Sequence, residues 1–265
     1  MITANDLRAI AGTAKRVQMH DHLAAAFNKY AAAYGVNNQK RIAEFLANVS
    51  HETGGFTKLA ENLNYSVDGL LKTFGRHRIS TADASRLGRS GKRAADQKAI
   101  ANKIYGGDWG RTNLGNTQPN DGWDYRGSGP GQVTGRSNFA KVEKESGLPV
   151  VANPDLLRQA DSGMKAALIL WQKWGLNEMA DAGQTTAIRK RWNGGSIGLA
   201  EVKDARGRAI KLNLAVPATS AVPVSVPTPT TPKPELPPSA TPTKKAGWLE
   251  VLAAFIIALF PGRSK

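Results

Sequence analysis

The sequence predicts a mainly α-helical protein, built from one large folded module and a short tail. Three observations predict this class. Apolar residues recur at helical spacing in five segments, few segments alternate as strands do, and a proline-rich stretch divides the chain near residue 215. The 265 residues, 41% of them hydrophobic, are enough for one good-sized core.

The five helical segments lie between residues 23 and 174. Each carries apolar residues three and four positions apart, as a helix with one buried face requires. The predicted helices are Leu23 to Tyr34, Arg41 to His51, Ala94 to Ile104, Ser137 to Glu145 and Ser162 to Trp174. Glycine-dense stretches at Tyr105 to Gly115 and Gly122 to Gly135 are predicted to be long loops, which usually line a binding site.

The tail and its linker differ in composition from the rest of the chain. Nine prolines lie between Pro217 and Pro242, and they remove backbone donors and helix-compatible geometry. We therefore divide the chain into a folded module at 1–214, a Pro/Thr-rich linker at 215–245 and a short apolar, basic-flanked C-terminal helix at 246–265.

The apolar stretch of the tail runs from Trp248 to Phe260. As a helix it would be about 20 Å long, which is short for a hydrocarbon core of about 30 Å. With basic residues on both sides, it is predicted to lie at an anionic membrane surface. Docking on the folded module, or self-association, is the alternative.

The chain is strongly basic, with 36 Lys and Arg against 21 Asp and Glu and a formal charge of +15. Five basic and two acidic residues follow residue 214, so twelve of these net charges belong to the folded module. Such a surface attracts nucleic acid, anionic lipid or phosphate-bearing cell walls.

The absence of cysteine excludes disulfides and a cysteine nucleophile. Asp6 interrupts the N-terminal stretch, so we expect no signal peptide.

Glu52 follows a helix whose apolar residues share one face: Ile42, Phe45, Leu46 and Val49. It falls near that face at the C-terminal end, where a poorly solvated carboxyl would suit a general acid. By position alone, a helix-end residue paired with Arg or Lys is the commoner case. Gly54 and Gly55 are predicted to stop the helix, which lets Glu61 turn back toward Glu52.

No metal or cofactor is expected. His51 and Glu52 match the start of the zinc-protease HExxH motif, but Gly55 stands where the second histidine must be. The run from His20 to His22 could touch a metal, although a surface cluster is the favoured interpretation.

Three segments in order carry a family resemblance. They read HETGGF at 51–56, ENLNYS at 61–66 and YRGSGPGQVTGRSNF at 125–139. Together they resemble glycoside hydrolase family 19, which contains plant-type chitinases and a branch of phage and prophage endolysins. The short gap between the two glutamates looks like the endolysin branch, and the resemblance runs from about residue 20 to 200.

The resemblance implies a lysozyme-like helical fold of two lobes with a central substrate groove. It also implies inverting hydrolysis of β-1,4 bonds between amino sugars, with Glu52 as the general acid and Glu61 as the base that activates water. Because inversion leaves room for that water, the two carboxyls are expected roughly 6.5 to 9.5 Å apart, against about 5 Å for a retaining pair. Thr134 is expected to help hold the water.

Five further residues are assigned to the substrate by the resemblance: Gln132, Asn138, Asn193, Tyr125 and Arg136. The amides match positions that hydrogen-bond the sugar, and the ring of Tyr125 would stack on it, as Trp123 and Trp192 could. From the residues alone, these rings are as readily core residues. Gln132, Thr134 and Asn138 could also be loop residues that satisfy backbone groups, but their joint match in order favours the site.

The third motif departs from the family pattern at three positions. Ser128 and Gly131 stand where the family usually has a larger or basic residue and a branched aliphatic one, and Phe139 replaces tyrosine. We therefore expect a looser groove wall and one hydroxyl fewer near the site.

Chitin and peptidoglycan both present N-acetylglucosamine in β-1,4 linkage, but the basic surface and the expected lack of a signal peptide favour peptidoglycan. We predict a monomeric, muramidase-type endolysin for host cell lysis, held in the host cytoplasm and then acting on glycan strands in the periplasm or cell wall. A chitinase is the alternative. A non-catalytic wall-binding or nucleic-acid-binding protein is the second alternative, although no nucleic-acid motif is visible and no such partner is expected.

Overall fold

The computed structural model describes residues 1–91 and 93–215. These residues form helices joined by loops, with isolated β-bridges in place of a sheet, so the predicted mainly α-helical class is confirmed. None of the helices in this part of the chain is both long enough and apolar enough to cross a membrane. The linker from residue 216 and the C-terminal segment at 246–265 lie outside the described residues, so their assignments stay predictions.

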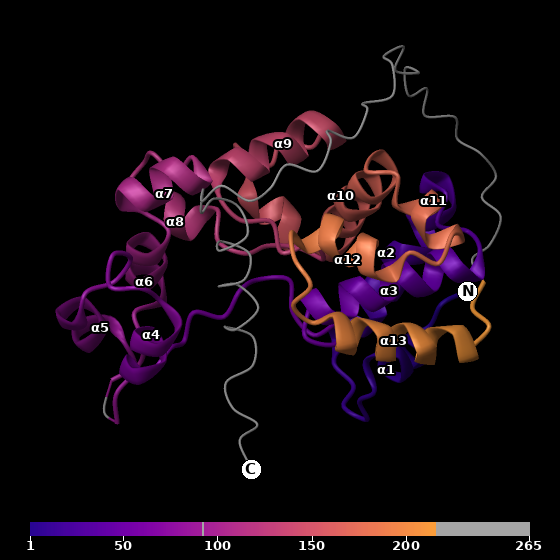
Figure 1. The fold of residues 1–265 in the computed structure, drawn as a ribbon, viewed down its shortest axis with the longest axis horizontal. Coiled ribbons are helices and arrows are strands. Elements are labelled where there is room, and N and C mark those ends of the chain that lie inside the picture. Colours follow the sequence, from indigo (N-terminus) through magenta and orange to yellow (C-terminus); the bar gives the residue numbers. More distant parts are fainter. Residues whose placement is uncertain (92, 216–265) are drawn as a thin grey trace, which may run out of the picture.

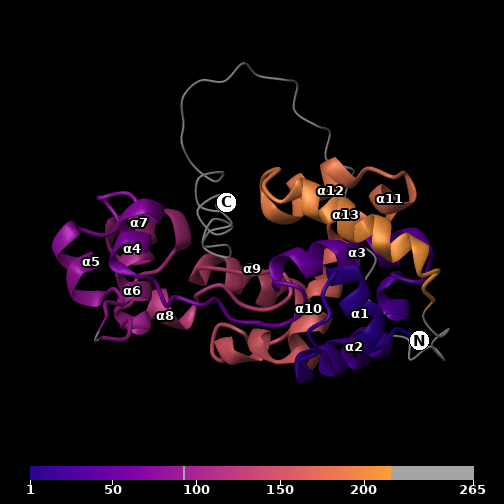
Figure 2. The ribbon, with the colours of Figure 1, turned by 90° about the horizontal axis from the view of Figure 1, so that it is seen from below.

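The described chain folds into two lobes that lie side by side, each with its own hydrophobic core (Figure 1). The larger lobe contains α1 (Ala4–Ala11), α2 (Gln18–Tyr30), η1 (Ala31–Tyr34), α3 (Gln39–Glu52), α9 (Arg136–Ser146), η2 (Pro154–Arg158), α10 (Ala160–Lys173), α11 (Leu176–Asp181), α12 (Thr185–Asn193) and α13 (Leu199–Lys211). The smaller lobe contains α4 (Val67–Thr73), α5 (Thr81–Leu87), α6 (Gln97–Ile104), α7 (Gly107–Leu114) and α8 (Asp121–Asp124). The turned view in Figure 2 shows the same separation.

α3 is the central helix of the larger lobe, and it is buried on all sides from its second turn to its end. Its apolar residues belong to the larger core. Its polar residues Glu44, Asn48 and Glu52 recur every four positions, so they share one side of the helix. Because a buried carboxylate needs a partner, this side is met by polar groups of the C-terminal helices, such as Arg206 and Thr185 on Glu44.

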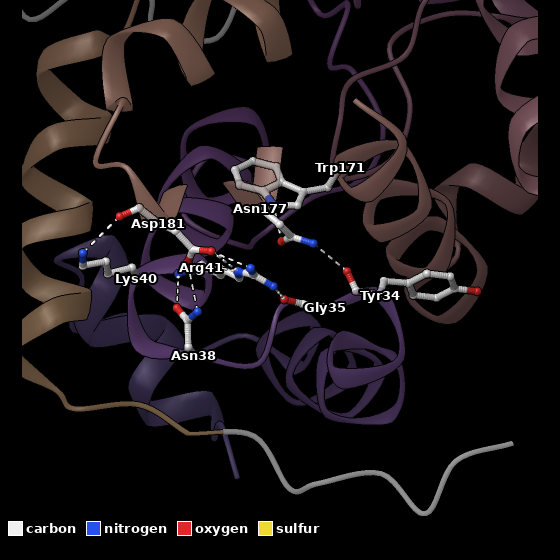
Figure 3. A network of polar contacts seen from close by, with 8 residues as sticks. All are labelled: Tyr34, Gly35, Asn38, Lys40, Arg41, Trp171, Asn177 and Asp181. Atoms are coloured by element: carbon white, nitrogen blue, oxygen red, sulfur yellow. Dashed lines mark hydrogen bonds and ion pairs between the residues drawn. The ribbon is translucent and has the colours of Figure 1, made fainter. Parts of the chain in front are cut away.

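A polar network fixes the start of α3 against α11 (Figure 3). Nε of Arg41 lies 3.0 Å from both carboxylate oxygens of Asp181, and Nη2 lies 2.5 Å from one of them. Asn38 caps α3 through the backbone N–H of Arg41 and also donates to Asp181 at 3.0 Å. α3 is therefore held at the end opposite Glu52, which gives that glutamate a rigid support.

Two segments connect the lobes, and they pair with each other. The outgoing segment follows α3, and the returning segment follows α8. The backbone N–H of Glu61 donates to the carbonyl of Gly127 at 2.9 Å, and that of Gly129 donates to Leu59 at 2.8 Å. This pairing places the second sequence motif directly beside the third.

All five segments predicted to be helical are helical, with ends shifted by a few residues. The prediction of a long loop at Tyr105 to Gly115 was wrong, because α7 occupies most of it. Glycine permits a tight turn there: a Cβ on Gly110 would lie 2.0 Å from the carbonyl oxygen of Tyr105, and one on Gly106 would lie 2.2 Å from that of Asn102. The stretch from Gly122 to Gly135 is a loop after α8 ends.

Candidate active site

Glu52 is the last residue of α3, and Glu61 lies on the outgoing segment between the lobes. Both are buried, with 4% and 7% of their surface exposed. Gly54, Gly55 and Phe56 between them all adopt positive φ angles, of 59°, 77° and 61°. Phe56 is fully buried, so core packing holds a backbone conformation that is unfavourable for a non-glycine residue. The helix ends at the two glycines, as predicted.

Glu52 is bound to a buried arginine of α12. Nη1 of Arg189 lies 2.5 Å from its Oε1, and the side-chain amide of Asn193 donates to the same oxygen at 3.3 Å. Arg189 has no exposed side-chain surface, and its Nε donates to the carbonyl of Ile197 at 2.9 Å. The structure therefore has the helix-end pairing with an arginine that position alone favoured, and it places the carboxyl in a buried environment. Asn193, assigned to the sugar, contacts Glu52 in this structure, and its role toward the sugar stays a prediction.

Glu61 has a different environment, supplied by the smaller lobe and the returning segment. The hydroxyl of Tyr105 donates to its Oε1 at 2.7 Å, and the backbone N–H of Gly127 lies 3.3 Å from its Oε2. Burial raises the pKa of Glu61 to about 7, although both hydrogen bonds and the positive charges of Arg78 and Arg126 act in the opposite direction. Glu61 therefore changes charge near neutral pH, as a group that transfers protons needs to do.

The two arginines near Glu61 lie on aromatic rings. The guanidinium of Arg78 is 3.8 Å from the ring centre of Trp109, and its Nε donates to the carbonyl of Ile104 at 2.9 Å. The guanidinium of Arg126 is 3.7 Å from the ring centre of Trp123. Burial lowers the pKa of Arg126 to about 10. These contacts hold both cations in place beside the carboxyl.

The returning segment carries Gln132 and Thr134, and Asn138 follows on α9. Their side chains bond backbone carbonyls: Thr134 donates to Gln132 at 3.1 Å, Asn138 to Thr134 at 2.7 Å and Gln132 to Gly129 at 3.1 Å. Gln132 has a φ of 46°, and its buried Oε1 has no hydrogen-bond partner in the described part of the chain. A strained residue with an unsatisfied acceptor is typical of a ligand site.

The prediction that Tyr125 stacks on a sugar was wrong, because its ring lies in the larger core and is 3% exposed. It packs edge-on against Phe139, with ring centres 5.0 Å apart, and its hydroxyl donates to the carbonyl of Val151. Arg136 covers the ring at 4.6 Å and forms an ion pair of 2.7 Å with the buried Asp121. Arg136, assigned to the substrate, therefore serves in this arrangement to hold the loop together.

The two tryptophans proposed for stacking on the sugar, Trp192 and Trp123, differ in how deeply they are buried. Trp192 is 7% exposed and belongs to an aromatic cluster with Trp171 and Phe45, at ring distances of 5.5 and 6.3 Å, so it is a core residue. Trp123 is partly buried, and one face of its ring carries the guanidinium of Arg126. The remaining candidate for a sugar platform is therefore Trp123.

The expectation of a looser groove wall stays a prediction, and the three departing positions have the following neighbours. Nε of Arg158 donates to the hydroxyl of Ser128 at 2.9 Å, so a basic group still lies at this position. A Cβ on Gly131 would lie 3.4 Å from the indole of Trp192, an ordinary van der Waals contact. Phe139 is fully buried, where a tyrosine hydroxyl would need a partner.

Arg189 and Tyr105 were not found from the sequence. Arg189 lies between Ile188 and Trp192 on the buried side of α12, and an arginine among apolar residues at helical spacing indicates a buried acidic partner. Tyr105 directly follows the apolar residues of α6, so its position in the sequence is typical of a core residue.

The interpretation of the run from His20 to His22 as a surface cluster was wrong for its first member. His20 is fully buried, and its Nε2 lies 3.1 Å from the carbonyl oxygen of Gly55, so α2 supports the turn between the two glutamates. Among residues 1–91 and 93–215, no cluster of histidine and acidic side chains could hold a metal ion.

We predict that Arg189→Ala lowers the free energy of unfolding by about 3 to 5 kcal/mol, because it leaves the carboxylate of Glu52 buried without its cation. Urea denaturation at neutral pH measures the change. Lys190→Ala on the exposed side of the same helix is the control and should stay within about 0.5 kcal/mol of the parent. A small effect of both substitutions would show that the ion pair does not support the fold.

The raised pKa of Glu61 makes the free energy of unfolding depend on pH. Because the pKa of Glu61 is raised from 4.5 to about 7 in the folded state, the native protein loses stability as pH rises through that range. Glu61→Gln removes this loss, so the stability of the variant relative to the parent should increase between pH 4 and pH 8. Each unit of pKa corresponds to about 1.4 kcal/mol. Denaturation curves at several pH values test this, and a constant difference would contradict it.

Comparison with known proteins gives structural and sequence relatives, although no family model matches the chain. A bacterial family 19 chitinase aligns with 82% of this chain and 97% of its own, with a TM-score of 0.49 and 18% identity. Chitinase C from Streptomyces griseus aligns with 81% of this chain and 93% of its own, with a TM-score of 0.47 and 16% identity.

A sequence relative from Haemophilus influenzae, a glycosyl hydrolase family 19 domain-containing protein, is 34% identical over 167 residues. The alignment covers 63% of this chain and 77% of the relative. This identity and coverage agree with the three motifs that surround Glu52, Glu61 and the returning segment. The chain therefore belongs to glycoside hydrolase family 19 and is a glycoside hydrolase.

Proposed function

We propose that this enzyme is an endolysin of muramidase type, which cuts β-1,4 bonds in the glycan strands of peptidoglycan and so lyses the bacterial cell. The observation that carries the proposal is the pair of buried carboxyls, Glu52 and Glu61, on consecutive segments where the lobes are joined. Two carboxyls, one acid and one base, are sufficient for glycoside hydrolysis with inversion.

In the proposed mechanism, Glu52 takes up a proton when the glycan binds and donates that proton to the oxygen of the leaving sugar. The guanidinium of Arg189, 2.5 Å away, stabilises the carboxylate that remains. Glu61 takes a proton from water, and the oxygen of that water attacks the anomeric carbon from the opposite face. A pKa of about 7 makes Glu61 a competent base near neutral pH. Thr134 would help hold the water, and the unpartnered Oε1 of Gln132 would accept a hydrogen bond from the sugar.

Charge supports peptidoglycan over chitin as the substrate. Twelve of the fifteen net positive charges belong to residues 1–214, and bacterial walls carry phosphate and carboxylate groups, whereas chitin is essentially uncharged. We further propose that the enzyme is monomeric, passes from the host cytoplasm to the wall at lysis, and contacts anionic membrane through the segment at 246–265.

We predict that purified peptidoglycan treated with the protein gains new muramic acid reducing ends, identified by mass spectrometry after borohydride reduction. Glu52→Gln and Glu61→Gln should each lower the rate by roughly 10²- to 10⁴-fold, the usual contribution of acid or base catalysis. Glu44→Gln is the matched control, because it changes another buried carboxyl of α3 that pairs with Arg206 rather than with the site.

Further measurements identify the substrate and the bond that is cut, and they distinguish the acid from the base. New glucosamine ends would change the bond assignment, and cleavage of chitin oligomers alone would make the protein a chitinase. DNA binding without any cleavage would contradict the proposal. If Glu52 is the acid, a substrate with a nitrophenyl leaving group should restore activity to Glu52→Gln, while azide should restore it only to Glu61→Gln.

The contact between Tyr105 and Glu61 predicts a pH effect. Tyr105→Phe removes a hydrogen bond that lowers the pKa of Glu61, so that pKa should rise further. Since a base must be ionised, the acid limb of kcat/KM should move to higher pH, with a larger loss at pH 6 than at pH 8.

Tyr65→Phe is the control for this shift. Tyr65 also lies near Glu61, but its buried hydroxyl has no hydrogen-bond partner in the described residues. Its removal should leave the acid limb in place. An equal loss at every pH for Tyr105→Phe would show that Tyr105 contributes packing alone.

A further inference from the structure

A polar cavity of about 530 Å³ lies in the larger lobe beside the turn that joins the two glutamates. Its walls come from α1 and the loop after it, from the end of α3 and the turn that follows, and from α13. In Figure 1, α3, α13 and α1 lie one below another in this lobe. His51 and Thr57 mark the wall shared with the turn. The volume is in the range of cavities that bind small ligands.

Four charged side chains line this cavity, one from the loop after α1 and three from α13. Lys15 and Arg208 supply positive charge, and Glu201 and Asp204, three residues apart on α13, supply negative charge. Within the described residues, Lys15, Glu201 and Asp204 form no ion pair. The cavity therefore offers cationic and anionic groups to a ligand that carries both signs of charge.

The cavity wall and the candidate acid belong to one packed unit. Gly198, with a φ of 76°, lies so close to the ring of His51 that a Cβ would be 2.1 Å from Cε1. The carbonyl of the preceding Ile197 accepts a hydrogen bond from Arg189, which binds Glu52. The wall of the cavity is thus connected, through Gly198 and Ile197, to the arginine that binds Glu52.

We propose that this cavity binds the peptide that substitutes muramic acid in peptidoglycan, an inference that rests on the proposed function. These peptides carry free carboxylates, which match Lys15 and Arg208, together with a free amino group, which matches Glu201 and Asp204. Chitin has no such substituent. His51, which lines the cavity, directly precedes Glu52, so the cavity borders the candidate acid along the chain.

The test compares two substrates that differ only in the peptide. One is intact peptidoglycan, and the other is the same glycan after an amidase has removed its peptides. The full chain is compared with a double variant, Glu201→Gln with Asp204→Asn. A second double variant, Asp108→Asn with Glu178→Gln, is the control, because it removes two exposed carboxylates elsewhere and changes the net charge equally.

The cavity variant should lose about tenfold in kcat/KM on intact peptidoglycan, the scale of one or two hydrogen bonds to charged groups, and much less on the peptide-free glycan. The control should behave like the parent on both substrates. Equal losses on the two substrates, or no loss on either, would overturn the inference while leaving the glycosidase proposal intact.

A binding measurement keeps the inference testable even if the parent cleaves no peptidoglycan. The free tripeptide L-Ala-γ-D-Glu-meso-diaminopimelate is titrated into the ¹⁵N-labelled full chain and followed by NMR. Amide shifts at His51, Thr57 and the first half of α13, lost in the cavity variant, would support the site independently of catalysis. Unchanged amides in this region at millimolar peptide would overturn it.

Discussion

The buried ion pair between Arg189 and Glu52 is the contact on which the arrangement of the larger lobe depends. A carboxylate and a guanidinium without solvent are stable only when their remaining hydrogen-bonding groups are satisfied. Asn193 supplies one such bond to Glu52, and the carbonyl of Ile197 accepts another from Arg189. These demands fix α12 and the loop after it against the end of α3, and the fit of Gly198 on His51 leaves little freedom in that loop.

The two candidate catalytic carboxyls are supported by different lobes. Glu52 is held by an arginine of the larger lobe, whereas Glu61 accepts a hydrogen bond from Tyr105 of the smaller lobe. The environments differ accordingly, because Glu52 contacts a guanidinium and an amide of α12, whereas burial raises the pKa of Glu61 to about 7 against the opposing effect of the Tyr105 hydroxyl. Different environments for two neighbouring carboxyls are what separate an acid from a base in glycoside hydrolysis.

Pairing of the outgoing and returning segments connects these two environments. Glu61 is positioned by its own backbone, which bonds Gly127, and the same returning segment carries Gln132 and Thr134. A rotation of one lobe against the other would strain these backbone hydrogen bonds. The polar cavity lined by α13 borders the turn that joins the two glutamates.

The sequence by itself determined the helical class, the main helices, the end of α3 at Gly54 and Gly55, and the family, because these depend on local spacing and on motifs read in order. The tertiary structure determined which residues contact the two glutamates and which aromatic rings are buried. Arg189 is 137 residues from Glu52 and Tyr105 is 44 from Glu61, distances over which no local pattern identifies a contact. Tyr125 shows the same limit, since only packing distinguishes a core ring from a sugar platform.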